Sequence, residues 1–136
     1  MTMIALKAGN GTYVGANPKD GTLIANRQGI EESEKFEMEV GTVPKAIVSS
    51  VALKSTSRGS YVSVTGWDGQ VQVGANDYIG LNELFEVYWR GADQIALMSA
   101  STGCFLAYTE EGNGTLQATG YDLGPLETFQ MVILDD

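Results

Sequence analysis

The sequence contains no histidine, a single cysteine and only 8 lysines and arginines among its 136 residues. Without histidine, the Ser-His-Asp and Cys-His nucleophilic arrangements, histidine-ligated metals and the histidine pH switch are excluded. Cys104 alone can form neither an internal disulfide nor a cysteine-rich zinc site, and we expect it to be a small buried side chain in a strand. These absences remove most of the usual parts of an enzyme. We therefore expect a non-catalytic protein with no metal and no cofactor.

Basic residues are also scarce relative to acidic ones, 8 against 17, which gives a formal charge of −9. An acidic protein repels phosphates, so the charge predicts neither nucleic acid nor an anionic membrane as a partner. No stretch approaches 18 apolar residues, and the N-terminus lacks a basic segment followed by an apolar run. We expect a cytoplasmic protein, with secretion after processing as the alternative. The length and the 43% hydrophobic content predict one folded domain over residues 1–136.

A pattern of four short segments recurs three times along the chain. An Ala-Leu segment is followed by a glycine and an aromatic residue, then by a turn glycine with an apolar alternation, and finally by a phenylalanine-led segment. The first segments begin at Ile4, Val51 and Ile95, and the last segments begin at Phe36, Phe85 and Phe129. Most segments alternate apolar with polar residues and are bounded by Gly, Asn, Asp and Ser, which is typical of strands. The pattern predicts an all-β protein of three pseudo-symmetric four-stranded units, at about 4–50, 51–94 and 95–134.

The dipeptides Asp20-Gly21, Asp68-Gly69 and Asn113-Gly114 lie between the second and third segments of the units. Such dipeptides supply the positive φ angles of tight hairpins. Three units of four strands are too few for a propeller, and the period is too long for a simple solenoid. The architecture predicted is therefore a β-trefoil, a closed barrel capped by hairpins. The expected core consists of Leu6, Leu53, Leu97, Leu23, Val71, Leu116, Phe36, Phe85, Phe129, Met38, Val87, Met131 and Trp89.

The order Ala-Leu-Lys, Gly-x-Tyr-Val, Asp-Gly and Glu-x-Phe-Glu resembles the fascin-like β-trefoil family, which includes fascin and hisactophilin. The resemblance covers residues 4 to 134 and implies the β-trefoil fold. It also implies two functions: actin binding, as in fascin, or a carbohydrate-binding module of the kind attached to polysaccharide-degrading enzymes. The chain lacks the titrating histidines of hisactophilin, and it has no tryptophan where ricin-type lectins carry Gln-x-Trp.

Aromatic and aspartate residues stand side by side in three of the polar loops and tips. An aromatic ring can lie under the apolar face of a sugar while a carboxylate accepts from its hydroxyls, so these pairs predict a glycan or polysaccharide as the partner. The pairs are Trp67-Asp68 at a hairpin tip, and Asp77-Tyr78 and Tyr121-Asp122 in corresponding loops. The alternative is that both tyrosines fold over the barrel end as a lid on the core, and that Asp68 only serves its turn.

Two other binding functions stay open. Actin binding would use the exposed cations Lys19, Arg27 and Arg58, although actin filaments are themselves acidic. A protease inhibitor would present a proline-stiffened loop, either residues 17–19 or residues 124–126.

Overall fold

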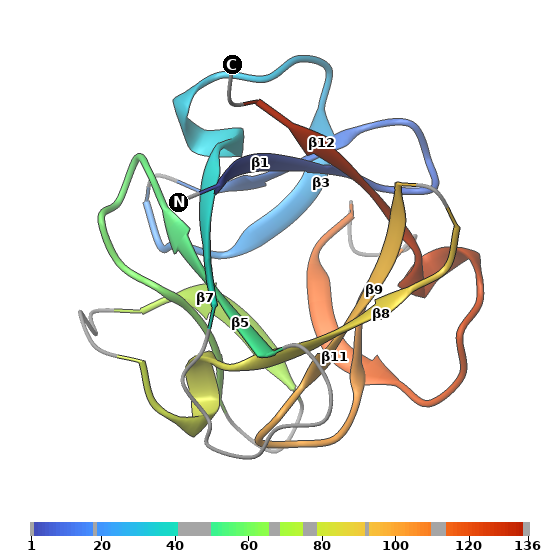
Figure 1. Cartoon of the computed structure of the whole chain (residues 1–136). Coiled ribbons are helices and arrows are strands. Elements are labelled where there is room, and N and C mark those ends of the chain that lie inside the picture. The colour runs from blue at the N-terminus through green and yellow to red at the C-terminus, as the bar shows by residue number, and fades with distance from the viewer. Residues whose placement is uncertain are drawn as a thin grey trace.

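The computed structural model describes residues 2–17, 19–40, 50–65, 69–74, 79–91, 93–109 and 114–134, and it is all-β (Figure 1). In these segments each group of four strands includes one short 3-10 helix, placed just before the fourth strand. The strands are β1 (Thr2–Lys7), β2 (Tyr13–Ala16), β3 (Leu23–Arg27), β4 (Phe36–Val40), β5 (Ser50–Ser55), β6 (Val62–Thr65), β7 (Gln70–Val73), β8 (Phe85–Trp89), β9 (Gln94–Ser99), β10 (Phe105–Tyr108), β11 (Leu116–Gly120) and β12 (Phe129–Ile133). The 3-10 helices are η1 (Glu32–Glu34), η2 (Leu81–Glu83) and η3 (Pro125–Glu127).

Six of the strands close into a barrel, which Figure 1 views along its axis. Going round the ring, β1 pairs with β4, β4 with β5, β5 with β8, β8 with β9, β9 with β12, and β12 returns to β1. All of these pairs are antiparallel. Closure leaves no free edge in the ring, which removes the usual site of strand-to-strand aggregation.

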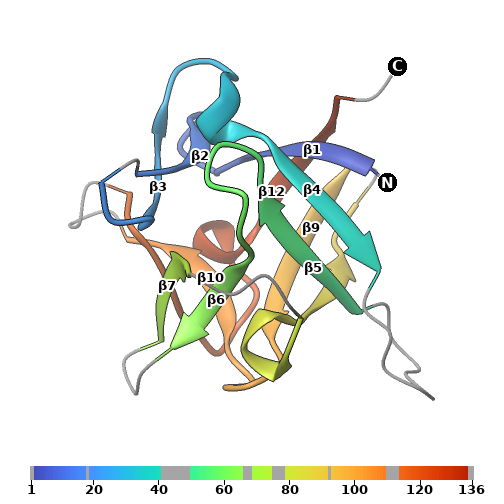
Figure 2. The same ribbon diagram turned by 90° about the vertical axis from the view of Figure 1, so that its left-hand side faces the viewer.

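The remaining strands form three hairpins, β2–β3, β6–β7 and β10–β11, which gather at one end of the barrel (Figure 2). They are joined to one another by the bridges Thr22↔Gln72, Gln70↔Gln117 and Ile24↔Thr115. The glycines at the hairpin tips contribute to these contacts between hairpins. The carbonyls of Gly21, Gly69 and Gly114 accept the N–H groups of Val73, Ala118 and Ala25 at 2.7, 2.8 and 2.7 Å.

Gly114 shows why a glycine is needed at these tips. Its φ is +88°, and a Cβ built on it would lie 2.4 Å from the carbonyl oxygen of Ala25. At another tip, the N–H of Thr22 donates to Oδ1 of Asp20 at 3.0 Å, and this hydrogen bond lowers the pKa of the Asp20 carboxyl. The predicted turn chemistry is therefore confirmed at the tips that the structure describes.

The core fills the barrel and the space under the hairpins. Most of the predicted core side chains are buried, and Met38 and Met131 are partly buried and pack against the rest. The fully enclosed members are Leu6, Leu23, Leu53, Leu97, Leu116, Val71, Phe36, Phe85 and Phe129, with Val87 at the margin.

Two predictions about side-chain position are wrong. Trp89 is 60% exposed, although its register partner on β9, Ile95, is fully buried, because Trp89 is the last residue of β8 and no later residue of that strand covers it. Cys104 is only half-buried and precedes β10, since the strand begins at Phe105. Within the described residues, no helix is long and apolar enough to cross a membrane.

Candidate ligand-binding site

Three short turns connect the first barrel strand of each group to the hairpin strand that follows it. Two backbone hydrogen bonds close each turn. The first runs from Ala8 N to Thr12 O at 2.8 Å, from Ser55 N to Ser60 O at 2.9 Å, and from Ser99 N to Cys104 O at 2.8 Å. The second runs from Gly11 N to Ala8 O at 3.0 Å, from Gly59 N to Ser55 O at 2.8 Å, and from Gly103 N to Ser99 O at 2.8 Å. The bounds of these bonds show that the turn 8–12 is one residue shorter than the turns 55–60 and 99–104. The three turns are therefore not equivalent.

The two longer turns are fastened to the neighbouring group of strands. Thr56 N donates to the carbonyl of Lys35 at 3.1 Å, and Ala100 N donates to the carbonyl of Leu84 at 3.0 Å. Both acceptors are the residue just before a barrel strand, β4 or β8. These contacts define two closed junctions, the turn 55–60 against residue 35 and the turn 99–104 against residue 84.

Buried serines stabilise the longer turns from within. Ser55 and Ser99 are fully buried, and their hydroxyls accept the N–H groups of Arg58 at 3.3 Å and Thr102 at 3.4 Å. In the short turn, the corresponding position holds Ala8, which has no hydroxyl.

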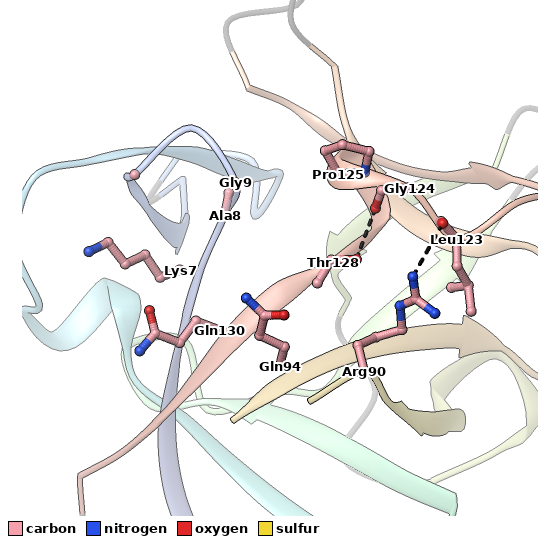
Figure 3. A pocket seen from close by; sticks show the side chains of 11 residues that line it. Lys7, Ala8, Gly9, Arg90, Gln94, Leu123, Gly124, Pro125, Thr128 and Gln130 are labelled. Atoms are coloured by element: carbon pink, nitrogen blue, oxygen red, sulfur yellow. Dashed lines mark hydrogen bonds between the residues drawn. The ribbon is translucent and has the colours of Figure 1, made fainter. Parts of the chain in front are cut away.

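The short turn is not fastened in this way. Gly9 and Thr128 correspond to the residues that are bonded in the closed junctions, yet no backbone hydrogen bond joins these two described residues. We call this place, the turn 8–12 against residues 123–128, the open junction. A cavity of about 600 Å³ lies there (Figure 3). Its walls are formed by Lys7, Ala8, Gly9, Gly11, Arg90, Gln94, Leu123, Gly124, Pro125, Thr128 and Gln130.

Polar side chains line the cavity in a row, with Lys7 and Arg90 at opposite ends and Gln130 and Gln94 between them (Figure 3). Arg90 Nη2 donates to the carbonyl of Leu123 at 3.5 Å. The Lys7 Nζ lies 5.8 Å from the centroid of the Tyr13 ring. A ligand here would meet two cations and two carboxamides.

Hydrogen bonds to neighbouring residues hold several of the side chains and backbone groups that line the cavity. Gln130 Nε2 donates to Oδ2 of Asp93 at 2.8 Å, which leaves the Gln130 side-chain oxygen free to accept from a ligand. The Thr128 hydroxyl donates to the Gly124 carbonyl at 2.9 Å. The Gly124 N–H donates to Oε1 of Glu127 at 2.9 Å. The wall residues are thus positioned before a ligand arrives.

One predicted site pair borders this cavity. Tyr121 is 84% exposed and Asp122 is exposed, and both directly precede Leu123 of the cavity wall. Tyr121 does not fold over the core, so the lid interpretation is wrong for it. The other predicted site residues, Trp67, Asp68, Asp77 and Tyr78, lie outside the described residues.

A second cavity of about 520 Å³ lies on the other side of the same short turn. Its lining includes Asn10, Thr12, Asn26 and Thr109, and none of the described residues that line it is charged. Asn10 Nδ2 and Thr12 Oγ1 both donate to the carbonyl of Ala25, at 3.3 and 2.7 Å, so much of its polar lining is already engaged. Among the described residues, no cluster of three acidic or cysteine side chains could hold a metal ion.

Comparison with known proteins shows the fold of the chain. No family model and no curated protein matches the sequence. Among solved structures, it is similar to ThreeFoil, a designed protein with three-fold symmetry, with a TM-score of 0.81 and 16% identity over 97% of this chain and 99% of that one. It is also similar to an endo-β-galactosidase from Clostridium perfringens that releases GlcNAcα1-4Gal, with a TM-score of 0.80, 12% identity and 99% of this chain covered.

A third similar structure is a lectin from Polyporus squamosus bound to the epitope Neu5Acα2-6Galβ1-4GlcNAc, with a TM-score of 0.77, 17% identity and 96% of this chain covered. The chain spans about a third of the galactosidase chain (33%) and about half of the lectin chain (48%). Taken with the closed six-stranded barrel and its hairpin cap, these likenesses define the chain as a β-trefoil.

Proposed function

We propose that this β-trefoil is a non-catalytic, lectin-like carbohydrate-binding module, built from three pseudo-symmetric units at about 4–50, 51–94 and 95–134. The glycan binds at the open junction. The observation that carries the proposal is the exposed Tyr121–Asp122 pair beside a cavity of about 600 Å³ lined by carboxamides and cations.

The chemistry of the cavity suits a saccharide. Its volume falls within the range of roughly 300–1,000 Å³ that is typical of small-ligand sites. Gln94 and Gln130 carry both donors and acceptors, which match the hydroxyls of a sugar. A saccharide that extends out of the cavity past Leu123 would reach the ring of Tyr121 for stacking and the carboxylate of Asp122 as an acceptor.

Two further points support a glycan rather than a catalysed reaction. The Polyporus lectin, which shares this fold over about half of its chain (48%), is bound to a glycan epitope, and this likeness supports a glycan as the class of ligand. The sequence has no histidine to act as a general base or a nucleophile's partner. Trp67-Asp68 and Asp77-Tyr78 stay predictions for additional sites, and the cytoplasmic location also stays a prediction.

The test is a glycan-array screen beside an actin co-sedimentation assay on one preparation, with binding then measured by calorimetry. We expect a saturable glycan signal that falls at least about tenfold in Tyr121→Ala, because stacking is lost while the fold is untouched. Ile133→Ala removes another side chain that is 60% exposed, outside the cavity wall, and should leave binding unchanged. A silent array with actin pelleting would overturn the proposal.

A further inference from the structure

The open junction concentrates positive charge on an acidic protein. The net charge is −9, yet both charged side chains among the described residues that line the cavity are cations, Lys7 and Arg90. Two of the other cations are neutralised locally: Arg27 lies 3.6 Å from Glu34, and Lys35 lies 3.3 Å from Glu32. Neither Lys7 nor Arg90 forms an ion pair with any carboxylate in the described part of the chain.

Both cations are positioned rather than loose. The Lys7 ammonium is held near the Tyr13 ring, and one guanidinium nitrogen of Arg90 is anchored on the Leu123 carbonyl. A guanidinium has five N–H donors in a rigid fork, so Arg90 keeps donors that can bind a carboxylate in a bidentate arrangement. Holding Arg90 in place beforehand reduces the entropy that a ligand must overcome.

Carboxylates near the cavity limit where a negative ligand can sit. Asp93 accepts from Gln130, and the Glu127 carboxylate accepts from the Gly124 N–H. Asp122 is exposed at the outer edge. A negative group would therefore be repelled at the Asp122 rim and attracted to the two ends of the row shown in Figure 3, where the cations stand.

We propose that the open junction selects acidic saccharides, with the carboxylate of one sugar bound by Arg90, a second acidic group near Lys7, and neutral hydroxyls held by Gln94 and Gln130. This inference rests on the proposed carbohydrate-binding function and names its ligand class. The shared chemistry is a sugar carboxylate, which both uronic acids and sialic acids supply.

The experiment compares acidic saccharides with neutral counterparts by calorimetry on the folded chain. One arm uses an oligogalacturonate against the neutral galactose oligomer, and the other uses sialyllactose against lactose, so the two sources of carboxylate are separated. The acidic member of at least one pair should bind about tenfold more tightly, with a preference that shrinks as salt rises. Arg90→Gln and Lys7→Gln should each remove most of that preference for the acidic member of the pair.

Lys19→Gln is the matched control, because it removes the same charge from an exposed residue that does not line the cavity. Equal binding of acidic and neutral saccharides would overturn the inference while leaving the proposed function in place. A preference for acid that survives both Arg90→Gln and Lys7→Gln would overturn the inference as well. No binding of any saccharide by a chain that is folded by circular dichroism would overturn the proposed function itself.

Discussion

The open junction and the two closed junctions are the same structural feature built in two ways. In the closed junctions, Thr56 and Ala100 donate their N–H groups to the preceding strand group, and buried serine hydroxyls hold the turn. In the open junction, the turn is one residue shorter, Ala8 replaces the serine and the equivalent backbone bond to Thr128 is missing. Features that all three turns share therefore build the fold, whereas the shorter turn without its serine and its backbone bond leaves the cavity.

The shared features include a glutamate in each 3-10 helix as well as the tip glycines. Glu34, Glu83 and Glu127 each accept the N–H of the residue three positions earlier, at 2.8, 2.8 and 2.9 Å. Glu34 and Glu83 are nearly fully buried and also accept a serine hydroxyl, whereas Glu127 is only half-buried. The glutamate of η3, beside the open junction, is therefore the least buried of the three and, among the described residues, lacks the serine partner that the other two have.

The largest expected effect comes from the hairpin cap. Gly114→Ala places a Cβ against the Ala25 carbonyl at a positive φ and should lower the free energy of unfolding by about 3 kcal/mol or more. Gly103→Ala is the control, because its φ is +75° but nothing lies within 4 Å of the added Cβ, and it should cost about 1 kcal/mol. Urea denaturation measures both, and equal costs would show that the close approach of the hairpins does not limit stability.

A smaller effect is expected at the 3-10 helices. Glu83→Ala leaves the buried Ser63 hydroxyl and the Gly80 N–H without this acceptor, which should cost about 2 kcal/mol. Glu127→Ala, in the half-buried equivalent, should cost about 1 kcal/mol or less. If chemical denaturation gives the reverse order, burial does not explain the difference between the two helices.

The smallest effect on stability, but a large one on binding, is expected from lengthening the short turn. Inserting one serine between Asn10 and Gly11 gives the turn the length of the other two, which should close the junction and reduce glycan affinity by at least about tenfold. Stability should change by less than about 1 kcal/mol, since a surface turn tolerates an added residue.

The same insertion between Thr102 and Gly103 serves as the control for that change. It lengthens a turn of a closed junction and should leave glycan affinity unaltered. Calorimetry measures the glycan affinity of both variants. If the chain lengthened after Asn10 keeps its full affinity, the length of the turn 8–12 does not determine binding.

Much of the fold could be predicted because the sequence repeats a pattern of four short segments three times. Phe36, Phe85 and Phe129 recur at matching places in the repeated pattern and are all buried, so the pattern predicts these core residues correctly. The prediction for Trp89 is wrong, because alternation along a strand gives the direction of a side chain but not how far neighbouring residues cover it at the end of the strand.

The site was harder to predict than the fold. The chemistry of Tyr121 and Asp122 predicts them as site residues, and that stays a prediction. Lys7 and Arg90 lie far apart in sequence and line the same cavity only because the barrel brings their strands together. Lys7 also follows the repeated Ala-Leu pair, and this position in the pattern indicates a role in the fold rather than in binding. The sequence does carry one signal. The turn 8–12 is one residue shorter than the turns 55–60 and 99–104, and a missing residue in a repeated pattern indicates a place where packing differs.

The most direct test of the site is an amide NMR titration with the saccharide that binds most tightly, because it reads all three junctions in one spectrum. We predict shifts confined to the turn 8–12, residues 121–130 and the neighbourhood of Arg90, with the turns 55–60 and 99–104 unmoved. Shifts centred on either closed junction, or spread equally over all three junctions, would show that the glycan does not bind specifically at the open junction.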